Sequence, residues 1–211
     1  MKWILDNLDT IFSKTFEHFI ISLLSLGIGS LISVPIGILV SKSKKLSSIV
    51  LSIASVLQTL PSLALLAIMV PFFGVGRLPA IVALVVYSLL PILRNTILGI
   101  ESVDKNTIDA SYGMGMSYWQ VLTKVQVPLA LPIIISGISL SGIYVVAWAT
   151  IASYIGAGGL GDLIFIGLNN YNFAAIYAGA IPVTLMALLF EFGIGKIEER
   201  FTPKHLTRER E

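Results

Sequence analysis

The sequence lacks cysteine, and its two histidines, His18 and His205, lie far apart along the chain. A protein without cysteine forms no disulfide bond and no thiolate metal site. A single histidine without companions at metal-ligand spacing is usually a solvated or capping residue. These absences exclude a disulfide-stapled fold and argue against a metal centre.

Charged residues are also scarce. They form 12% of the 211 residues, against 55% hydrophobic residues and a mean hydropathy of +0.89. Soluble domains contain about 25% charged residues, so this composition indicates a protein surrounded by lipid. The N-terminal segment has no basic region followed by a short apolar core and a small-residue cleavage site, so we expect no cleaved signal peptide.

The sequence contains several long runs of apolar residues. A bilayer core requires about 20 apolar residues in one helix. Five stretches meet this requirement, at residues 18–40, 46–72, 78–100, 129–155 and 173–194. We therefore expect an all-α, polytopic membrane protein with five transmembrane helices in one domain over residues 18–197. A segment over 1–17 would precede it, and a basic tail over 198–211 would follow.

The second stretch is interrupted by Pro61. Proline removes a backbone donor and clashes with the preceding turn, so we expect a kink there within a single crossing. Two shorter pieces that meet at Gln58–Pro61 are the alternative, although each piece would be too short to span alone.

The distribution of lysine and arginine predicts the orientation. With five crossings, one side carries ten basic residues and the other carries Lys2, Lys14 and Arg77. The basic side holds Lys42, Lys44, Lys45, Lys105, Lys124, Lys196, Arg200, Lys204, Arg208 and Arg210. We therefore expect the N-terminus outside the cell membrane, and the 101–128 loop and the C-terminus in the cytoplasm.

Small and hydroxyl side chains recur within the predicted spans. Ser25, Gly29, Ser33 and Gly37 are spaced every four residues, a pattern typical of close helix packing, with a pore-lining role as the alternative. The fourth span is rich in hydroxyl groups, which indicates packing against protein or the lining of a wet cavity. The residues that we consider candidates for a pathway or gate are Gln58, Thr59, Pro61, Ser139, Tyr144, Trp148, Thr150, Gly156, Gly158, Gly159 and Gly161.

The glycine cluster over 156–161 resembles a phosphate-binding loop only superficially. No Lys-Ser or Lys-Thr pair follows it, so no nucleotide site is expected in this chain. A turn that caps the fourth span and a hinge beside a pathway are both open interpretations.

Acidic residues are rare at mid-membrane depth. Arg94 and Glu191 lie near the ends of their spans, where long side chains reach the interface. An ion relay normally shows more buried acids, and the chain has no obvious internal repeat. Both observations argue against an ion-coupled carrier.

A polar segment separates the third and fourth spans. We expect one short helix from Thr107 to Thr123, with Asp109 in its first turn near the positive helix end. Gly113 and Gly115 are poor helix formers and predict a bend or a close backbone contact. Pro128 is expected to begin the next element.

The spacing of this segment resembles the EAA loop of ABC importer permeases. That pattern is Glu-Ala-Ala, three residues, Gly, nine residues and Ile-x-Leu-Pro. Here it reads Asp109-Ala110-Ser111, three residues, Gly115, nine residues and Val125-x-Val127-Pro128. The resemblance implies a coupling helix that docks on a separate ATPase subunit. The contact would use Asp109, Ala110, Ser111, Gly113, Met114 and Gly115, and Val125, Val127 and Pro128 would fix the link to the fourth span.

Other stretches resemble the osmoprotectant subfamily of these importers. They are Gln58–Leu66, Leu90–Thr96, Trp148–Thr150 and Gly156–Gly161. The resemblance implies a type I importer permease, a non-enzymatic subunit for glycine betaine, carnitine, choline or related quaternary ammonium compounds. It implies ATPase subunits that bind ATP and Mg, a second permease subunit, identical or paralogous, and a separate extracytoplasmic binding protein. It implies no cofactor in this chain and no nucleic-acid partner.

Two other functions remain open from the sequence. A permease for another small solute, such as an amino acid, would share every mechanical feature. An ion-coupled carrier or channel would instead transport without ATPase subunits. A membrane enzyme is disfavoured because the sequence has no nucleophile–base or metal constellation.

Overall fold

The computed structural model describes residues 2–201, and within that range the chain contains helices and no strand. The elements are α1 (Lys2–Asp6), α2 (Leu8–Val40), α3 (Lys44–Thr59), α4 (Ser62–Phe73), α5 (Arg77–Glu101), α6 (Lys105–Gly113), α7 (Tyr118–Val121), the π-helix η1 (Leu122–Gln126), α8 (Val127–Ala152), the 3-10 helix η2 (Ser153–Ile155), α9 (Leu160–Asn169) and α10 (Phe173–Phe201). The predicted all-α fold is confirmed.

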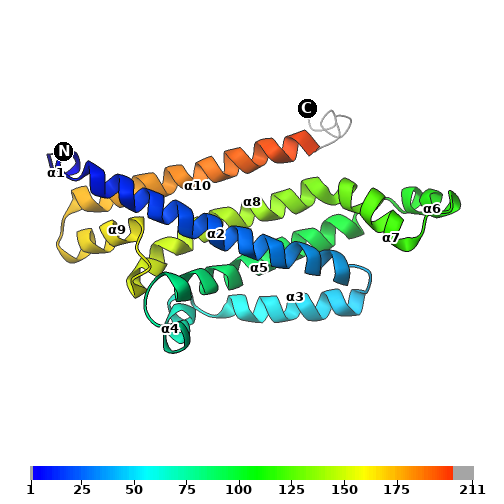
Figure 1. Cartoon of the computed structure of the whole chain (residues 1–211), viewed down its shortest axis with the longest axis horizontal. Coiled ribbons are helices and arrows are strands. Elements are labelled where there is room, and N and C mark those ends of the chain that lie inside the picture. Colours follow the sequence, from blue (N-terminus) through cyan, green and yellow to red (C-terminus); the bar gives the residue numbers. More distant parts are fainter. Residues whose placement is uncertain (1, 202–211) are drawn as a thin grey trace.

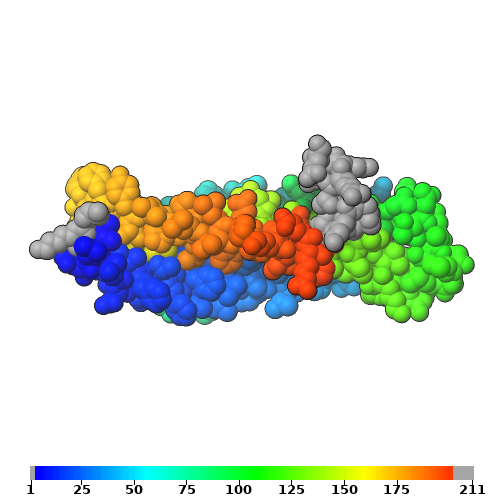
Figure 2. Space-filling model, turned by 90° about the horizontal axis from the view of Figure 1, so that it is seen from above, coloured from blue at the N-terminus to red at the C-terminus, as the bar shows by residue number. Residues whose placement is uncertain are grey.

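The four long apolar helical runs, α2, α5, α10 and the run that contains α8, form an elongated bundle (Figures 1 and 2). α2 and α5 are parallel, because Gly29 lies against Ser88 and Gly37 lies against Thr96. α8 runs antiparallel to α5, and its Ser141 hydroxyl donates to the Ser88 carbonyl at 3.2 Å. α1 and the last described turn of α10 lie at opposite ends of the bundle (Figure 1).

Close packing of small residues joins α2 to α5. A Cβ atom at Gly29 would overlap Ser88, and one at Gly37 would lie 2.7 Å from Thr96. Ser25 and Ser33, the other members of the predicted four-residue pattern, are fully buried. Lipid tails are as apolar as these helices, so van der Waals contact at close range supplies the association energy. The predicted packing role of this pattern is therefore confirmed.

The predicted break at Pro61 is present, but the bend there is much larger than a kink. α3 and α4 meet at 95°. Leu60 (φ −64°, ψ 130°) and Pro61 (φ −58°, ψ 138°) are both extended, which turns the chain rather than merely straining a helix. The Tyr87 hydroxyl donates to the Leu60 carbonyl at 2.6 Å and satisfies a group that the break leaves without a helical partner.

The bent pair still returns the chain along the bundle. α3 follows the end of α2, whereas α5 begins where Arg77 pairs with Glu17, near the beginning of α2. Because α2 and α5 are parallel, α3 and α4 together make the return passage. The described chain has four helices long and apolar enough to cross a membrane, and five spans if the bent pair counts as one.

Several predicted boundaries are wrong. α2 begins at Leu8 rather than His18, and α10 continues to Phe201 rather than ending near Ile194. The fourth span is the end of a longer helical run that starts at Tyr118. Short α9 was not predicted at all. The predicted basic-tail residues Lys204, His205, Arg208 and Arg210 lie outside the described residues.

Candidate functional site

The polar segment forms a projection at one end of the bundle (Figure 1). Its first helix, α6, begins after Asp104, whose carboxylate accepts a hydrogen bond from the Thr107 backbone N–H at 3.0 Å. A side-chain acceptor at this position satisfies a backbone donor that has no partner within the helix. Asp109 was expected in the first turn but lies mid-helix, so Asp104 is the capping acid. The Asp104–Thr107 spacing was the sequence signal that could have revealed it.

The segment is two helices and not the single one expected over Thr107–Thr123. α6 ends at Gly113, and the chain turns through Gly115, whose φ is +83°. A positive φ favours glycine because other side chains clash there. The predicted bend is therefore confirmed at Gly115, while Gly113 is the last residue of α6. The hydrogen bond from Met116 N–H to the Ser111 carbonyl, at 3.2 Å, closes the turn.

Large apolar side chains are exposed on this projection. Met114 is 75% exposed and Trp119 is 55% exposed, and Tyr112 and Tyr118 are also exposed. An exposed apolar patch within a polar segment is typical of a protein–protein contact. Of these residues, only Met114 was predicted from the sequence as a contact. The aromatic residues within a polar stretch were a usable signal.

The projection is firmly attached to the bundle. Val121 and Leu122 are fully buried, and Leu122 packs with Ile100 of α5 and with Ala130 and Ile134 of α8. Val127 is packed against the same cluster, whereas Val125 is half-buried and Pro128 is exposed in the first turn of α8. Proline is tolerated in that turn because its missing N–H has no helical partner there. The projection is therefore in direct packing contact with α5 and α8.

A cluster of aromatic rings lies at the bend between α3 and α4. Trp148 of α8 contacts Tyr87 of α5, with ring centroids 4.4 Å apart, and Tyr144 of α8, with centroids 5.5 Å apart. The Gln58 amide nitrogen donates to the Tyr87 carbonyl at 3.3 Å. Four pathway candidates, Gln58, Pro61, Tyr144 and Trp148, thus gather in one region.

The remaining pathway candidates of the spans do not join this cluster. The Thr59 hydroxyl donates to the Val56 carbonyl within its own helix. Ser139 and Thr150 belong to α8, but helical periodicity turns them away from the face that carries Tyr144 and Trp148. The Thr150 hydroxyl is buried without a partner among the described residues.

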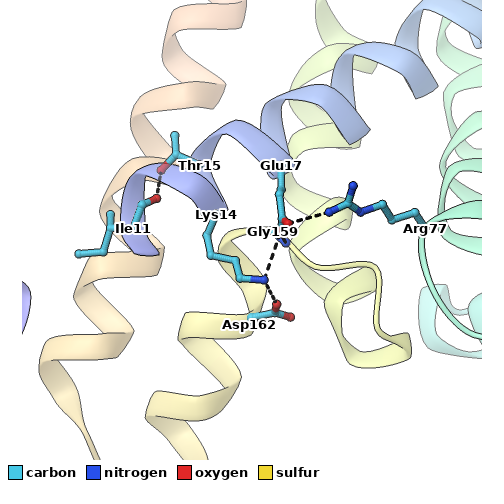
Figure 3. A network of polar contacts seen from close by, with 7 residues as sticks. All are labelled: Ile11, Lys14, Thr15, Glu17, Arg77, Gly159 and Asp162. Carbon is cyan, nitrogen blue, oxygen red and sulfur yellow. Dashed lines mark hydrogen bonds and ion pairs between the residues drawn. The ribbon is translucent and has the colours of Figure 1, made fainter. Parts of the chain in front are cut away.

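An ionic cluster holds the glycine turn beside α9, at the end of the bundle opposite α6 (Figures 1 and 3). Glu17 accepts a hydrogen bond from Gly159 N–H at 3.1 Å and pairs with Arg77 at 2.6 Å. Lys14 bridges Glu17, at 3.1 Å, and Asp162, at 2.7 Å. Three helices, α2, α5 and α9, are thereby joined around the turn. This cluster was not predicted from the sequence.

The glycines of the turn have distinct structural roles. Gly156 ends η2 in the left-handed conformation, with φ +80°. A Cβ atom at Gly159 would lie 3.0 Å from Nδ1 of the buried His18, and Gly161 packs on the Thr150 carbonyl. These contacts favour the interpretation of a capping turn over that of a free hinge.

Comparison with known proteins agrees with this geometry. The family described as "Binding-protein-dependent transport system inner membrane component" matches residues 17–203. The carnitine transport permease protein OpuCB of Listeria monocytogenes is 54% identical over 94% of this chain and 91% of its own length. The glycine betaine/carnitine/choline transport system permease protein OpuCB of Bacillus subtilis (strain 168) is 49% identical over 92% of this chain and 89% of its own. The choline transport system permease protein OpuBB of the same organism is 47% identical over 94% of this chain and 91% of its own length.

Solved structures match the fold. A chain of the MetNI methionine ABC transporter, in an inward-facing conformation, has a TM-score of 0.81 and 24% identity over 92% of this chain and 96% of its own. A chain of an amino acid ABC transporter solved with histidines has a TM-score of 0.78 and 21% identity over 93% of this chain and 96% of its own. The fold is therefore that of ABC importer permeases, as expected. With the family match covering most of its length, the chain belongs to the binding-protein-dependent transport system inner membrane components and is a multi-pass membrane protein.

Proposed function

We propose that this chain is the permease subunit of an ATP-driven importer for osmoprotectants that carry a quaternary ammonium group, such as carnitine, glycine betaine or choline. The observation that carries the proposal is the 54% identity to a carnitine transport permease over 94% of this chain. Relatives named for glycine betaine and choline transport support the same substrate class.

The projection of α6 and α7 is the contact for the ATPase subunits. Asp109, Ala110, Ser111 and the Gly115 turn lie on it, next to the exposed Met114 side chain. The ATPase binds ATP and Mg, and this chain supplies only the docking surface. Movement of the ATPase passes through Leu122 to α5 and α8, because that side chain packs between them.

The assembly contains a second permease subunit, identical or paralogous, and a separate extracytoplasmic binding protein. The N-terminus lies outside and the projection lies in the cytoplasm, as the distribution of basic residues predicts. Residues 18–197 form the transport domain. The exposed face around Tyr144 and Trp148 borders the pathway at the interface of the two permeases.

Reconstitution tests this function directly. The permease is placed in liposomes with its ATPase subunits and binding protein, and uptake of labelled carnitine, glycine betaine and choline is measured with and without ATP. We expect uptake only when ATP and the ATPase are both present. Solute movement by the permease alone along an ion gradient would instead establish a carrier or channel. ATP-driven uptake of amino acids alone would establish a permease for another solute.

A further inference from the structure

Three aromatic side chains form a continuous ladder at the middle of the bundle. Tyr87 is buried and held by its hydroxyl on the Leu60 carbonyl, at 2.6 Å. Trp148 leans on Tyr87, with the rings inclined by 45°, and Tyr144 leans on Trp148, with the rings inclined by 33°. The ladder therefore begins in the core, at the break between α3 and α4, and ends in an exposed ring.

The exposure of Tyr144 is unusual for its position. Its side chain is 40% exposed, although it lies well within α8, between Ser141 and Val145, which are both fully buried. Tyrosines that face lipid are normally found at the membrane interfaces, where the hydroxyl reaches water. An exposed tyrosine away from the ends of a span is instead typical of a face that meets protein or a wet cavity.

A quaternary ammonium group matches this surface chemically. Its nitrogen carries no hydrogen, so it donates no N–H hydrogen bond, and aromatic ring faces attract it through their negative quadrupole. Carnitine, glycine betaine and choline, the substrates named for the relatives, share this group and differ in the rest of the molecule. A site for all three must recognise the shared group.

We propose that Tyr144 and Trp148 form a cation–π ledge on which the quaternary ammonium group of the substrate rests during its passage. This inference rests on the proposed function, since it assigns the substrate a contact inside the permease. Tyr87 is a positioning residue: it is buried behind Trp148 and fixes the tilt of that ring through their 4.4 Å contact. Its own hydroxyl is fixed by the α3–α4 bend.

A one-sided surface of two aromatic rings suits a transport pathway better than an aromatic site that encloses the ligand on all sides. Conduction requires a site favourable enough to enter and weak enough to leave. A one-sided aromatic surface gives modest attraction without enclosing the ligand. The ledge therefore favours quaternary ammonium over other cations without trapping it between the two membrane surfaces.

Two matched variants separate the ring from the hydroxyl. Tyr144→Leu removes the aromatic face, whereas Tyr144→Phe retains it. Both changes fall on an exposed side chain and leave Trp148, which packs against the core, in place. Binding of labelled tetramethylammonium to the purified permease–ATPase complex, without the binding protein, is the primary measurement. Competition by choline and by its uncharged carbon analogue, in which carbon replaces the nitrogen, tests the role of charge.

We expect saturable binding of tetramethylammonium that choline displaces better than its uncharged analogue does. Loss of a cation–π contact in Tyr144→Leu should weaken this binding about tenfold, while Tyr144→Phe should stay within about threefold of the native protein. The proposal is overturned if the native protein does not bind tetramethylammonium in this way. It is also overturned if the Tyr144→Leu variant binds as well as the native protein, or if the Tyr144→Phe variant binds as poorly as Tyr144→Leu.

Failure of the ledge is distinguishable from failure of the proposed function. Uptake of carnitine, glycine betaine and choline by the native assembly depends on ATP whether or not the ledge exists. If that uptake is normal while tetramethylammonium binding is absent, only the ledge is wrong. If the native assembly takes up none of these compounds with ATP, the proposed function itself is wrong.

Discussion

At the scale of single residues, glycines and exposed aromatics have the most specific tasks. Gly159 occupies a position with φ +85° where its N–H donates to Glu17 and its missing side chain leaves room for His18. Trp119 has the opposite character, since it exposes a large apolar surface on the projection. We therefore expect Gly159 to contribute to stability and Trp119 to contribute to recognition of the ATPase.

Gly159→Ala should destabilise the permease. The new Cβ atom would lie 3.0 Å from the His18 ring in a backbone conformation that only glycine adopts easily. We expect a loss of about 1–3 kcal/mol, measured as a lower midpoint of thermal unfolding in detergent. Gly27→Ala is the control, because nothing lies within 4 Å of a Cβ there and alanine is the better helix former. Equal midpoints for the two variants would contradict the proposed role of the turn.

Trp119→Ala should weaken the contact with the ATPase. Exposed tryptophans are frequent anchors of interfaces, and truncating one commonly costs about 2 kcal/mol, or roughly thirtyfold in affinity. The measurement is titration of the detergent-solubilised permease with its purified ATPase. Tyr171→Asn is the control: Tyr171 is 86% exposed and has a positive φ of 54°, a conformation that asparagine tolerates. Unchanged ATPase affinity in Trp119→Ala would place the contact elsewhere.

At the scale of elements, η1 is the joint between the projection and the bundle. Its five residues form a π-helix that leads without interruption into α8. A π-helix in an otherwise α-helical run accommodates an extra residue and is frequent at functional sites. It sets the angular position of α7 relative to α8, into which it leads.

Deletion of Thr123 tests this joint. Thr123 is exposed, so its removal costs little packing and should convert η1 to regular α-helix. A π-bulge kinks the helix that contains it, so its loss should straighten this joint and tilt the docking face away from the ATPase. We expect an inserted protein with little ATP-driven uptake and weak stimulation of ATP hydrolysis by the binding protein. Thr123→Ala retains the length and should behave as native. Full uptake by the deletion variant would exclude a role for the π register.

Elements were predictable to different degrees for physical reasons. Apolar length alone predicted the spans, because a bilayer leaves few alternatives to helix. The break at Pro61 was predictable from local chemistry, but its 95° angle and the hydrogen bond there from the distant Tyr87 hydroxyl were not. The ion pair of Lys14 with Asp162 joins residues 148 positions apart, which no local pattern reveals. The same holds for the polar segment between the third and fourth spans. Its residue spacing identified the EAA-like loop, whereas its division into two helices was visible only in the structure.

At the scale of the whole molecule, the two ends of the bundle have different compositions. One end carries the projection with its exposed aromatics, and the other carries the ionic cluster of Figure 3. The distribution of basic residues predicts that the projection lies inside the cell. Because the chain contains no cysteine, single introduced cysteines report on this orientation without interference.

Single-cysteine labelling should reveal opposite exposure of the two ends. Tyr171→Cys should react in intact cells with a membrane-impermeant maleimide, because Tyr171 is exposed and lies just after α9, the helix that carries Asp162 of the ionic cluster. Met114→Cys, on the projection, should react only after the cells are permeabilised. The unaltered protein is the control and should not be labelled. Reaction of Met114→Cys in intact cells would reverse the predicted orientation.

The bent return passage has a consequence for how the protein enters its membrane. α3 carries Ser47, Ser48, Ser52 and Ser55 on only 16 residues, and α4 has only 12 residues, so neither is long enough to partition into lipid by itself. α5, which is long, apolar and joined to α4 by a short turn, is the stable partner. During synthesis α3 and α4 should therefore stay outside the lipid until α5 emerges, and all three should enter together as a hairpin. A glycosylation-mapping series of truncated chains would detect this order, and stable insertion of a chain ending at Gly76 would refute it.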